Sequence, residues 1–340
     1  MTKAKEVGLI TENANAMEYV AHAQLAESMG FGSFWVPENY AMPAAFTALG
    51  AIAVSTSTIK LGTGVVNPYT RHPVLLAMEL AALDQISSGR AILGLGGGIK
   101  LWIEEQMGIS YDRPVSAMRE TVSILRRLFS GETVEHEGRV FNVGAGMRFA
   151  LEPHRAHVPI YVGATGPRAQ ELAGEVADGF FPFFCQPESI RAAIKRVKAG
   201  AVRGGRDLAN FDMSALLIVS VGDDDRVARE AIKPAVATFF AWFANQPELP
   251  LFAEYGLSPD DVEVIRKSYA AGEIRSDMVS EAAIDGVSIS GSPERCREKL
   301  AGLIDAGITK PIIAPYTLLP GSGWADQLEW LQQNLLRDFM

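Results

Sequence analysis

Three glycine-rich segments, each at the end of an apolar run, are the parts of this chain best suited to hold a ligand. Gly163-Ala164-Thr165-Gly166-Pro167 ends one run and opens a helical pattern. Its glycines let backbone amides approach a ligand, and helix N-terminal amides bind phosphate readily. A plain strand-to-helix turn, with proline in the first helical turn, is the alternative interpretation.

The other two glycine-rich segments favour close contact between backbone and ligand. Gly94–Gly98 lacks the third glycine of a dinucleotide fingerprint, because Ile99 stands there. It suits a strand end where a flat ring passes, or simple packing against small residues. Lys60–Pro68 has two glycines and a threonine inside a strand-like run, which indicates a bulge or the close approach of a ligand.

Few side chains at the strand ends could act as acids or bases. Glu38 and Asn39 follow an apolar run and could hydrogen-bond a substrate or move a proton; capping the next helix is the alternative. His72, before Pro73, could be a general acid or purely structural. No strand-end lysine, His-x-His pair or carboxylate cluster is evident, so Schiff-base and metal-dependent chemistry are not expected. We therefore expect a bound cofactor that supplies the reactivity, and no metal.

Eight apolar runs alternate with helical patterns and must position these residues. Continuous apolar runs are typical of parallel strands buried on both faces. The predicted strands are Val7–Thr11, Ser33–Pro37, Lys60–Asn67, Ala91–Gly96, Pro159–Ala164, Gly179–Phe184, Ala215–Gly222 and Pro311–Tyr316. This pattern predicts an α/β fold, a (β/α)8 TIM barrel, with a doubly wound sheet as the alternative. In such a barrel the strand ends named above form the active site.

The 340 residues are predicted to form one domain, 1–340, because no linker interrupts the pattern. Two segments look like insertions: a hairpin at about 131–151 and a helical stretch at about 246–290.

The net charge of −9 argues against nucleic-acid binding. Two cysteines without metal-type spacing, no signal peptide and no apolar stretch long enough for a bilayer suggest a cytoplasmic protein with no membrane association.

Several long segments resemble the bacterial luciferase-like monooxygenase superfamily. They are LGTGVVNPYTRHP (61–73), LDQISSGRAILGLGGG (83–98), PIYVGATGPRAQELAGEVADGF (159–180), GRVFNV (138–143) and GVSISGSPERCREKLAGLIDAGI (286–308). Within the superfamily the chain is most similar to the branch of methylenetetrahydromethanopterin reductase, which uses the deazaflavin coenzyme F420.

The resemblance implies a barrel with an insertion, usually dimeric, and a cofactor at its C-terminal mouth. It implies a non-prolyl cis peptide at Gly64-Val65 that supports the flavin ring, and a phosphate site at Gly163–Pro167. Thr63, Asn67, Gly96 and Gly97 would lie along the ring.

The chain also departs from that branch at positions that carry side-chain chemistry. Asn39 stands where the family commonly has histidine, and Ile10 and Ile99 stand where the branch has acidic residues. Methylenetetrahydromethanopterin is therefore doubtful as the substrate. Glu12, Glu38 or Tyr69 would have to replace the missing proton donors.

The resemblance thus predicts hydride transfer between coenzyme F420 and a small organic substrate. An FMN-dependent monooxygenase supplied by a partner flavin reductase is the first alternative. A non-catalytic flavin-binding protein is the second.

Overall fold

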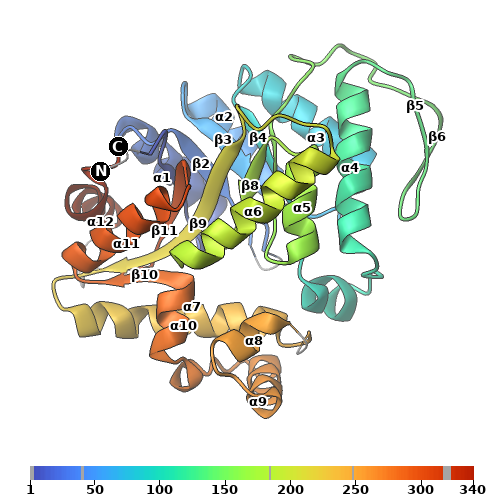
Figure 1. The fold of residues 1–340 in the computed structure, drawn as a ribbon. Coiled ribbons are helices and arrows are strands. Elements are labelled where there is room, and N and C mark those ends of the chain that lie inside the picture. The colour runs from blue at the N-terminus through green and yellow to red at the C-terminus, as the bar shows by residue number, and fades with distance from the viewer. Residues whose placement is uncertain (1–3, 40–41, 184, 247–248, 317–322) are drawn as a thin grey trace.

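Eight parallel strands close into a barrel in the computed structural model, which describes residues 4–39, 42–183, 185–246, 249–316 and 323–340 (Figure 1). The barrel order is β1-β2-β3-β4-β7-β8-β9-β11, and β11 pairs back with β1. The strands are β1 (Gly8–Ile10), β2 (Ser33–Val36), β3 (Lys60–Thr63), β4 (Ala91–Gly96), β7 (Ile160–Gly163), β8 (Gly179–Phe181), β9 (Asp212–Val221) and β11 (Lys310–Pro315). The predicted barrel is confirmed, because every apolar run that was expected to form a strand forms one.

Helices surround the barrel, and all but the last two of them lie between one barrel strand and the next. They are α1 (Ala16–Ser28), α2 (Ala45–Ser55), α3 (Pro73–Ile86), η1 (Leu101–Gln106), α4 (Pro114–Phe129), α5 (Pro167–Val176), α6 (Pro187–Arg203), α7 (Asp225–Phe243), α11 (Pro293–Asp305), α12 (Trp324–Leu331) and η3 (Gln332–Leu336). Helix α2 was not predicted, because its apolar sequence carries no polar face to set a helical period.

The first insertion is the predicted hairpin, formed by β5 (Val134–Glu137) and β6 (Asn142–Met147), and it extends beyond α4 (Figure 1). Glu120 of α4 fixes its turn by accepting hydrogen bonds from the backbone amides of residues 139–141 at 2.9–3.1 Å. Burial works to raise the pKa of Glu120, but these amide donors bring it below its ordinary value.

The second insertion is helical, as predicted, but it ends in a strand that was not expected. It contains α8 (Pro250–Glu254), α9 (Pro259–Ala270), η2 (Ser276–Met278), α10 (Glu281–Val287) and β10 (Ser288–Gly291). Strand β10 pairs with the last part of β9, from Ile218 to Val221, whereas β8 pairs with the first part. Strand β10 was not predicted, because its sequence is short and polar and does not form an apolar run. The helices of this insertion share one hydrophobic cluster with barrel residues such as Trp35 and Phe181.

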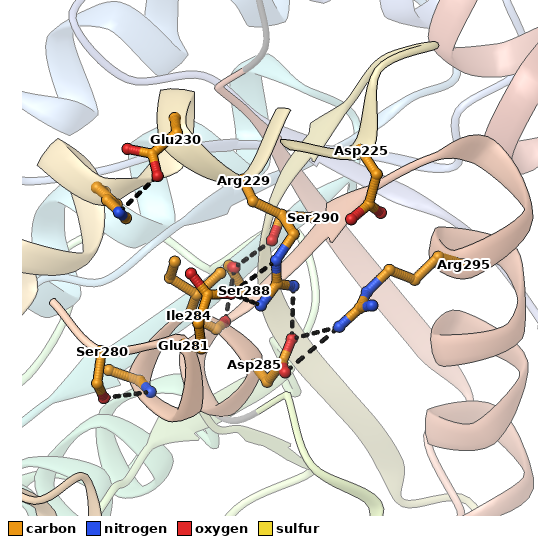
Figure 2. Close-up of polar contacts among 12 residues, drawn as sticks. Asp225, Arg229, Glu230, Ser280, Glu281, Ile284, Asp285, Ser288, Ser290 and Arg295 are labelled. Atoms are coloured by element: carbon orange, nitrogen blue, oxygen red, sulfur yellow. Dashed lines mark hydrogen bonds and ion pairs between the residues drawn. The ribbon is translucent and has the colours of Figure 1, made fainter. Parts of the chain in front are cut away.

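A network of charged groups holds α7 against this insertion. The Arg229 side chain, only 9% exposed, lies between Glu281 and Asp285 of α10, and Arg295 of α11 approaches Asp285 (Figure 2). The Arg229 guanidinium donates to Asp285 at 2.7 Å and to Glu281 at 3.0 Å. Helix α7 is therefore fixed near its start, while its last turns extend to the mouth of the barrel.

None of the helices in the described part of the chain has both the length and the apolar character needed to cross a bilayer.

Candidate active site

A cavity of about 210 Å³ lies at the C-terminal ends of the barrel strands. Backbone and small residues from three strand ends form one part of its lining: Gly64, Val65, Asn67, Gly96, Gly97, Gly98, Gly163, Ala164 and Thr165. Carboxyl and amide groups from the ends of β1 and β2 add Glu12, Glu38 and Asn39. Eight of the eleven residues that were predicted to bind the cofactor therefore line one cavity, together with Glu38 and Asn39. The three that do not line it are Thr63, Gly166 and Pro167.

The end of β3 is held by its packing against the glycines of β4 and β7. The Gly64-Val65 peptide is cis, as the resemblance implied. A Cβ on Gly96 would stand 2.6 Å from Cγ2 of Val65, and one on Gly163 would stand 3.3 Å from its Cγ1. Glycine is thus required at 96 by packing against Val65, and this strand end presents bare backbone to the cavity.

Thr63 does not line the cavity. Its side chain is fully buried, and its Oγ1 donates to the Gly94 carbonyl at 2.8 Å and accepts from the Gly94 amide at 2.9 Å. The β3–β4 ladder is interrupted here, between the Gly62–Ile92 pair and the Val66–Leu95 bridge. The hydroxyl therefore replaces a backbone partner that β3 no longer supplies.

Asn67 lines the cavity and also shapes the loop behind it. Its Oδ1 accepts from the backbone amides of Tyr69 at 3.0 Å and Thr70 at 3.1 Å. This Asx turn fixes the chain that leaves β3. Tyr69 itself is not among the lining residues, and its hydroxyl donates to the Asp112 carbonyl.

The loop after β7 offers unused backbone donors. Thr165 lines the cavity, and Gly166 and Pro167 form the N-cap and first residue of α5. Within the described chain, the amides of Thr165 and Gly166 have no hydrogen-bond partner. Gly166 has φ −84° and ψ 152°, and a Cβ there would meet nothing within 4 Å. The fold itself does not require glycine at 166, so the open space is available to a ligand.

A buried glutamine holds this loop in place. Gln170 is 1% exposed, and its Nε2 donates to the Thr165 carbonyl at 2.8 Å. Arg196 of α6 donates to Gln170 Oε1 at 2.9 Å. The direction of the free amides at 165 and 166 is therefore fixed by a chain of contacts from α6 through α5.

Glu38 lines the cavity, but other groups already use its two oxygens. Arg71 forms a bidentate ion pair with it, and the first amide of α2, at Ala45, donates to Oε1 at 3.3 Å. Glu38 therefore does both things that were considered for it: it lines the cavity, and it accepts a hydrogen bond from the first amide of the next helix. Arg71 also donates to Glu79 of α3 at 2.8 Å, which ties the loop after β2 to α3.

The structure places His72 away from the cavity. It is exposed, and its Nδ1 accepts from the Val74 amide at 3.3 Å as the N-cap of α3. Its ring also packs edge-on against Phe141 with centroids 5.7 Å apart, so both contacts fit the structural interpretation of this histidine.

Glu12, at the end of β1, is the carboxyl group in the cavity that no cation pairs within the described chain. Tyr316, at the end of β11, donates its hydroxyl to Glu12 Oε2. Burial raises the pKa of Glu12 above its ordinary value, although the tyrosine hydrogen bond works against this. Burial and the nearby Glu12 also raise the pKa of Tyr316. Both residues were visible in the sequence as strand ends, but only the closed barrel brings the first and last strands together.

Aromatic side chains form the rest of the wall, and sequence reasoning missed them. Phe183 stacks on Phe239 with ring centroids 4.6 Å apart, and Trp102 meets Trp242 edge-on at 5.1 Å. Phe243 completes the group. Trp242 is half-buried and lines the cavity. An apolar stripe on a helix looks the same in sequence whether it faces a core or a cavity.

The two isoleucines at positions where the resemblance implied acidic residues have different surroundings. Ile99 lines the cavity and presents an apolar side chain to it. Ile10 is fully buried in the barrel and lies under Gly64, where its Cδ1 would stand 2.8 Å from a Cβ.

Comparisons with known proteins agree with this geometry. The profile of the luciferase-like monooxygenase family matches residues 2–310. The chain is 36% identical to 5,10-methylenetetrahydromethanopterin reductase of Methanolobus tindarius over 86% of this chain and 88% of that protein. It is 32% identical to an F420-dependent hydroxymycolic acid dehydrogenase of Mycobacterium tuberculosis, over 74% of this chain and 71% of that protein. The structure of the coenzyme F420-dependent tetrahydromethanopterin reductase of Methanopyrus kandleri superposes with a TM-score of 0.85 at 28% identity, covering 100% of both chains. The chain therefore belongs to the luciferase-like monooxygenase family.

Proposed function

We propose that this protein is an oxidoreductase that uses coenzyme F420 to transfer a hydride to or from a small organic substrate. The observation that carries the proposal is the start of α5, where two free amides border open space at the edge of a glycine-walled cavity. Relatives that are F420-dependent by name, one of them matched across the full chain, support the choice of cofactor.

The residues present fit such a cofactor. The free backbone amides of Thr165 and Gly166, which follow Gly163 and Ala164, would hold its phosphate group at the N-terminus of α5. Pro167 has no amide N–H to donate, and it begins the helix behind them. The bare backbone at Gly64, Gly96 and Gly97, together with Val65, would lie against the ring. When bound, the deazaflavin supplies the carbon that accepts or gives the hydride.

Glu12 is the best-placed group to exchange a proton with the substrate. Its carboxyl lies in the cavity, and burial raises its pKa above the ordinary value for a carboxyl group. Tyr316 orients it through its hydrogen bond. Glu38 acts through Arg71 as a positioning residue for the loop after β2, and Asn39 of that loop contributes a neutral amide to the cavity.

A side-by-side titration of the purified protein with coenzyme F420 and with FMN tests this proposal. We expect saturable binding of coenzyme F420 and much weaker binding of FMN. Tight FMN binding, with oxygen consumption when reduced FMN is supplied by a flavin reductase, would favour the monooxygenase alternative. Saturable binding without turnover of any substrate would favour a non-catalytic flavin-binding protein.

We also propose that the protein is a homodimer. Helix α3 carries three large apolar side chains that are 45–53% exposed, at Leu75, Met78 and Ile86. Unpaired apolar side chains grouped on one helix favour contact with a second copy. Light scattering coupled to size exclusion measures the mass directly, and a monomer would contradict this proposal.

The two cysteines are free and buried, which fits a reducing compartment such as the cytoplasm.

A further inference from the structure

The part of the cavity wall that is not glycine and backbone is built from aromatic rings. Trp102 comes from η1, Phe183 from the chain after β8, and Phe239, Trp242 and Phe243 from the last turns of α7. The ring pairs are in contact at 4.6–5.2 Å between centroids. These rings therefore support one another as one surface, here called the aromatic wall.

Two independent contacts fix the position of the aromatic wall. Asn245, just after α7, donates from Nδ2 to Glu105 of η1 at 3.2 Å, beside the Trp102–Trp242 contact. At its other end α7 is held by Arg229 between Glu281 and Asp285 (Figure 2). Because α7 is held at both ends, the aromatic wall on its last turns is a preformed surface. Such a surface suits recognition of a flat apolar molecule.

The charges around the cavity argue against an ionic substrate. No lysine, arginine or histidine lines the cavity in the described part of the chain. A substrate phosphate or carboxylate beside the aromatic wall would lose its hydration without gaining a cation. The charge of Glu38 is already matched by Arg71, and Glu12 is hydrogen-bonded by Tyr316. Ile99 adds further apolar surface.

We propose that the aromatic wall binds an uncharged, flat and mainly apolar substrate, such as an aromatic or cyclic ketone or the matching alcohol. This inference rests on the proposed function, because it assigns the substrate class of the same site. It leaves the glycine-walled part of the cavity to the cofactor and the aromatic part to the substrate.

Three aryl methyl ketones of different charge test the proposal. They are acetophenone, the anion 4-acetylbenzoate and the cation 4-acetylphenyltrimethylammonium, titrated by calorimetry into the full-length protein with and without coenzyme F420. We expect acetophenone to bind at least tenfold more tightly than either ion. Equal or tighter binding of the anion would overturn the proposal. Preference for the cation would instead identify the wall as a cation-binding aromatic site, which also overturns it.

Tryptophan signals locate the bound probe without any measurement of activity. The protein contains five tryptophans, which 5-fluorotryptophan labelling makes visible by fluorine NMR. Acetophenone should shift the signals of Trp102 and Trp242 and leave those of Trp35 and Trp330 unchanged. Trp242→Leu should weaken acetophenone binding at least tenfold, whereas Trp330→Leu, the same change at a half-buried site on α12, should not. Shifts at Trp35 or Trp330 alone would contradict the proposal.

The outcome separates the two proposals. If coenzyme F420 binds normally but acetophenone is not preferred, the substrate class is wrong and the proposed function stands. If Trp242→Leu weakens the binding of coenzyme F420 but leaves the binding of acetophenone unchanged, the aromatic wall holds the cofactor and the inference fails. If coenzyme F420 does not bind at all, the proposed function fails, whatever the probes do.

Discussion

Replacing Gly166 by aspartate should separate the stability of the fold from cofactor binding. The backbone at 166 is extended, and a side chain there meets nothing within 4 Å, so the fold can accept it. Aspartate is also a preferred N-cap and interacts favourably with the helix dipole, by about 0.3–1 kcal/mol. We therefore expect the unfolding temperature of Gly166→Asp to equal or exceed that of the wild type.

The same change should weaken binding of a phosphate-bearing cofactor strongly. Two like charges in contact near a protein surface repel each other by about 4 kcal/mol, which corresponds to roughly a thousandfold in the dissociation constant. Gly166→Asn is the matched control, because asparagine has the same shape and is also a good N-cap but carries no charge. Any loss of affinity that is caused by the size of the side chain alone appears in both variants. The ratio of their dissociation constants for coenzyme F420 therefore isolates the effect of the charge.

Fluorescence titration of coenzyme F420 at two salt concentrations measures this ratio. We expect the aspartate variant to bind far more weakly than the asparagine variant, and the difference to shrink as salt screens the charges. If aspartate and asparagine bind coenzyme F420 equally well, the phosphate does not lie at the start of α5, and the assignment of Thr165 and Gly166 is wrong.

Three further variants test the groups that shape the site. Because burial raises the pKa of Glu12, the folded protein holds its proton more tightly, and stability is lost as pH rises through that raised pKa. The gain in unfolding temperature of Glu12→Gln over wild type should therefore grow as the pH rises above the ordinary pKa of a glutamate; a difference that does not change with pH contradicts the assigned environment. Thr63→Val leaves the Gly94 amide without a partner and should cost about 1–3 kcal/mol of unfolding free energy in urea, whereas Thr63→Ser should cost less. Arg229→Met should lower stability by about 1–3 kcal/mol and weaken acetophenone binding through the position of α7; unchanged binding would show that the aromatic wall does not need this anchor.

The order of strands and helices could be predicted from the sequence because parallel barrel strands are buried on both faces. Their apolar runs stand out locally, and the glycine segments mark where β3, β4 and β7 meet the cavity. Helix α2 and strand β10 were missed for the opposite reason. Helix α2 is apolar on all sides, and strand β10 is short and polar. Neither sequence therefore shows the alternation of apolar and polar residues that marks a helix or a strand.

The sequence alone predicted the barrel strands, the glycine-walled side of the site and the need for a cofactor, because each of these rests on a local pattern of residues. The resemblance to a known family added the kind of cofactor. Only the tertiary structure decided which side chains reach the cavity. It paired Glu12 with Tyr316 from opposite ends of the chain, turned His72 into a helix cap, and brought Trp102 and Trp242 into contact across about 140 residues of sequence. These partners are set by closure of the barrel and by the packing of α7, which no local pattern records.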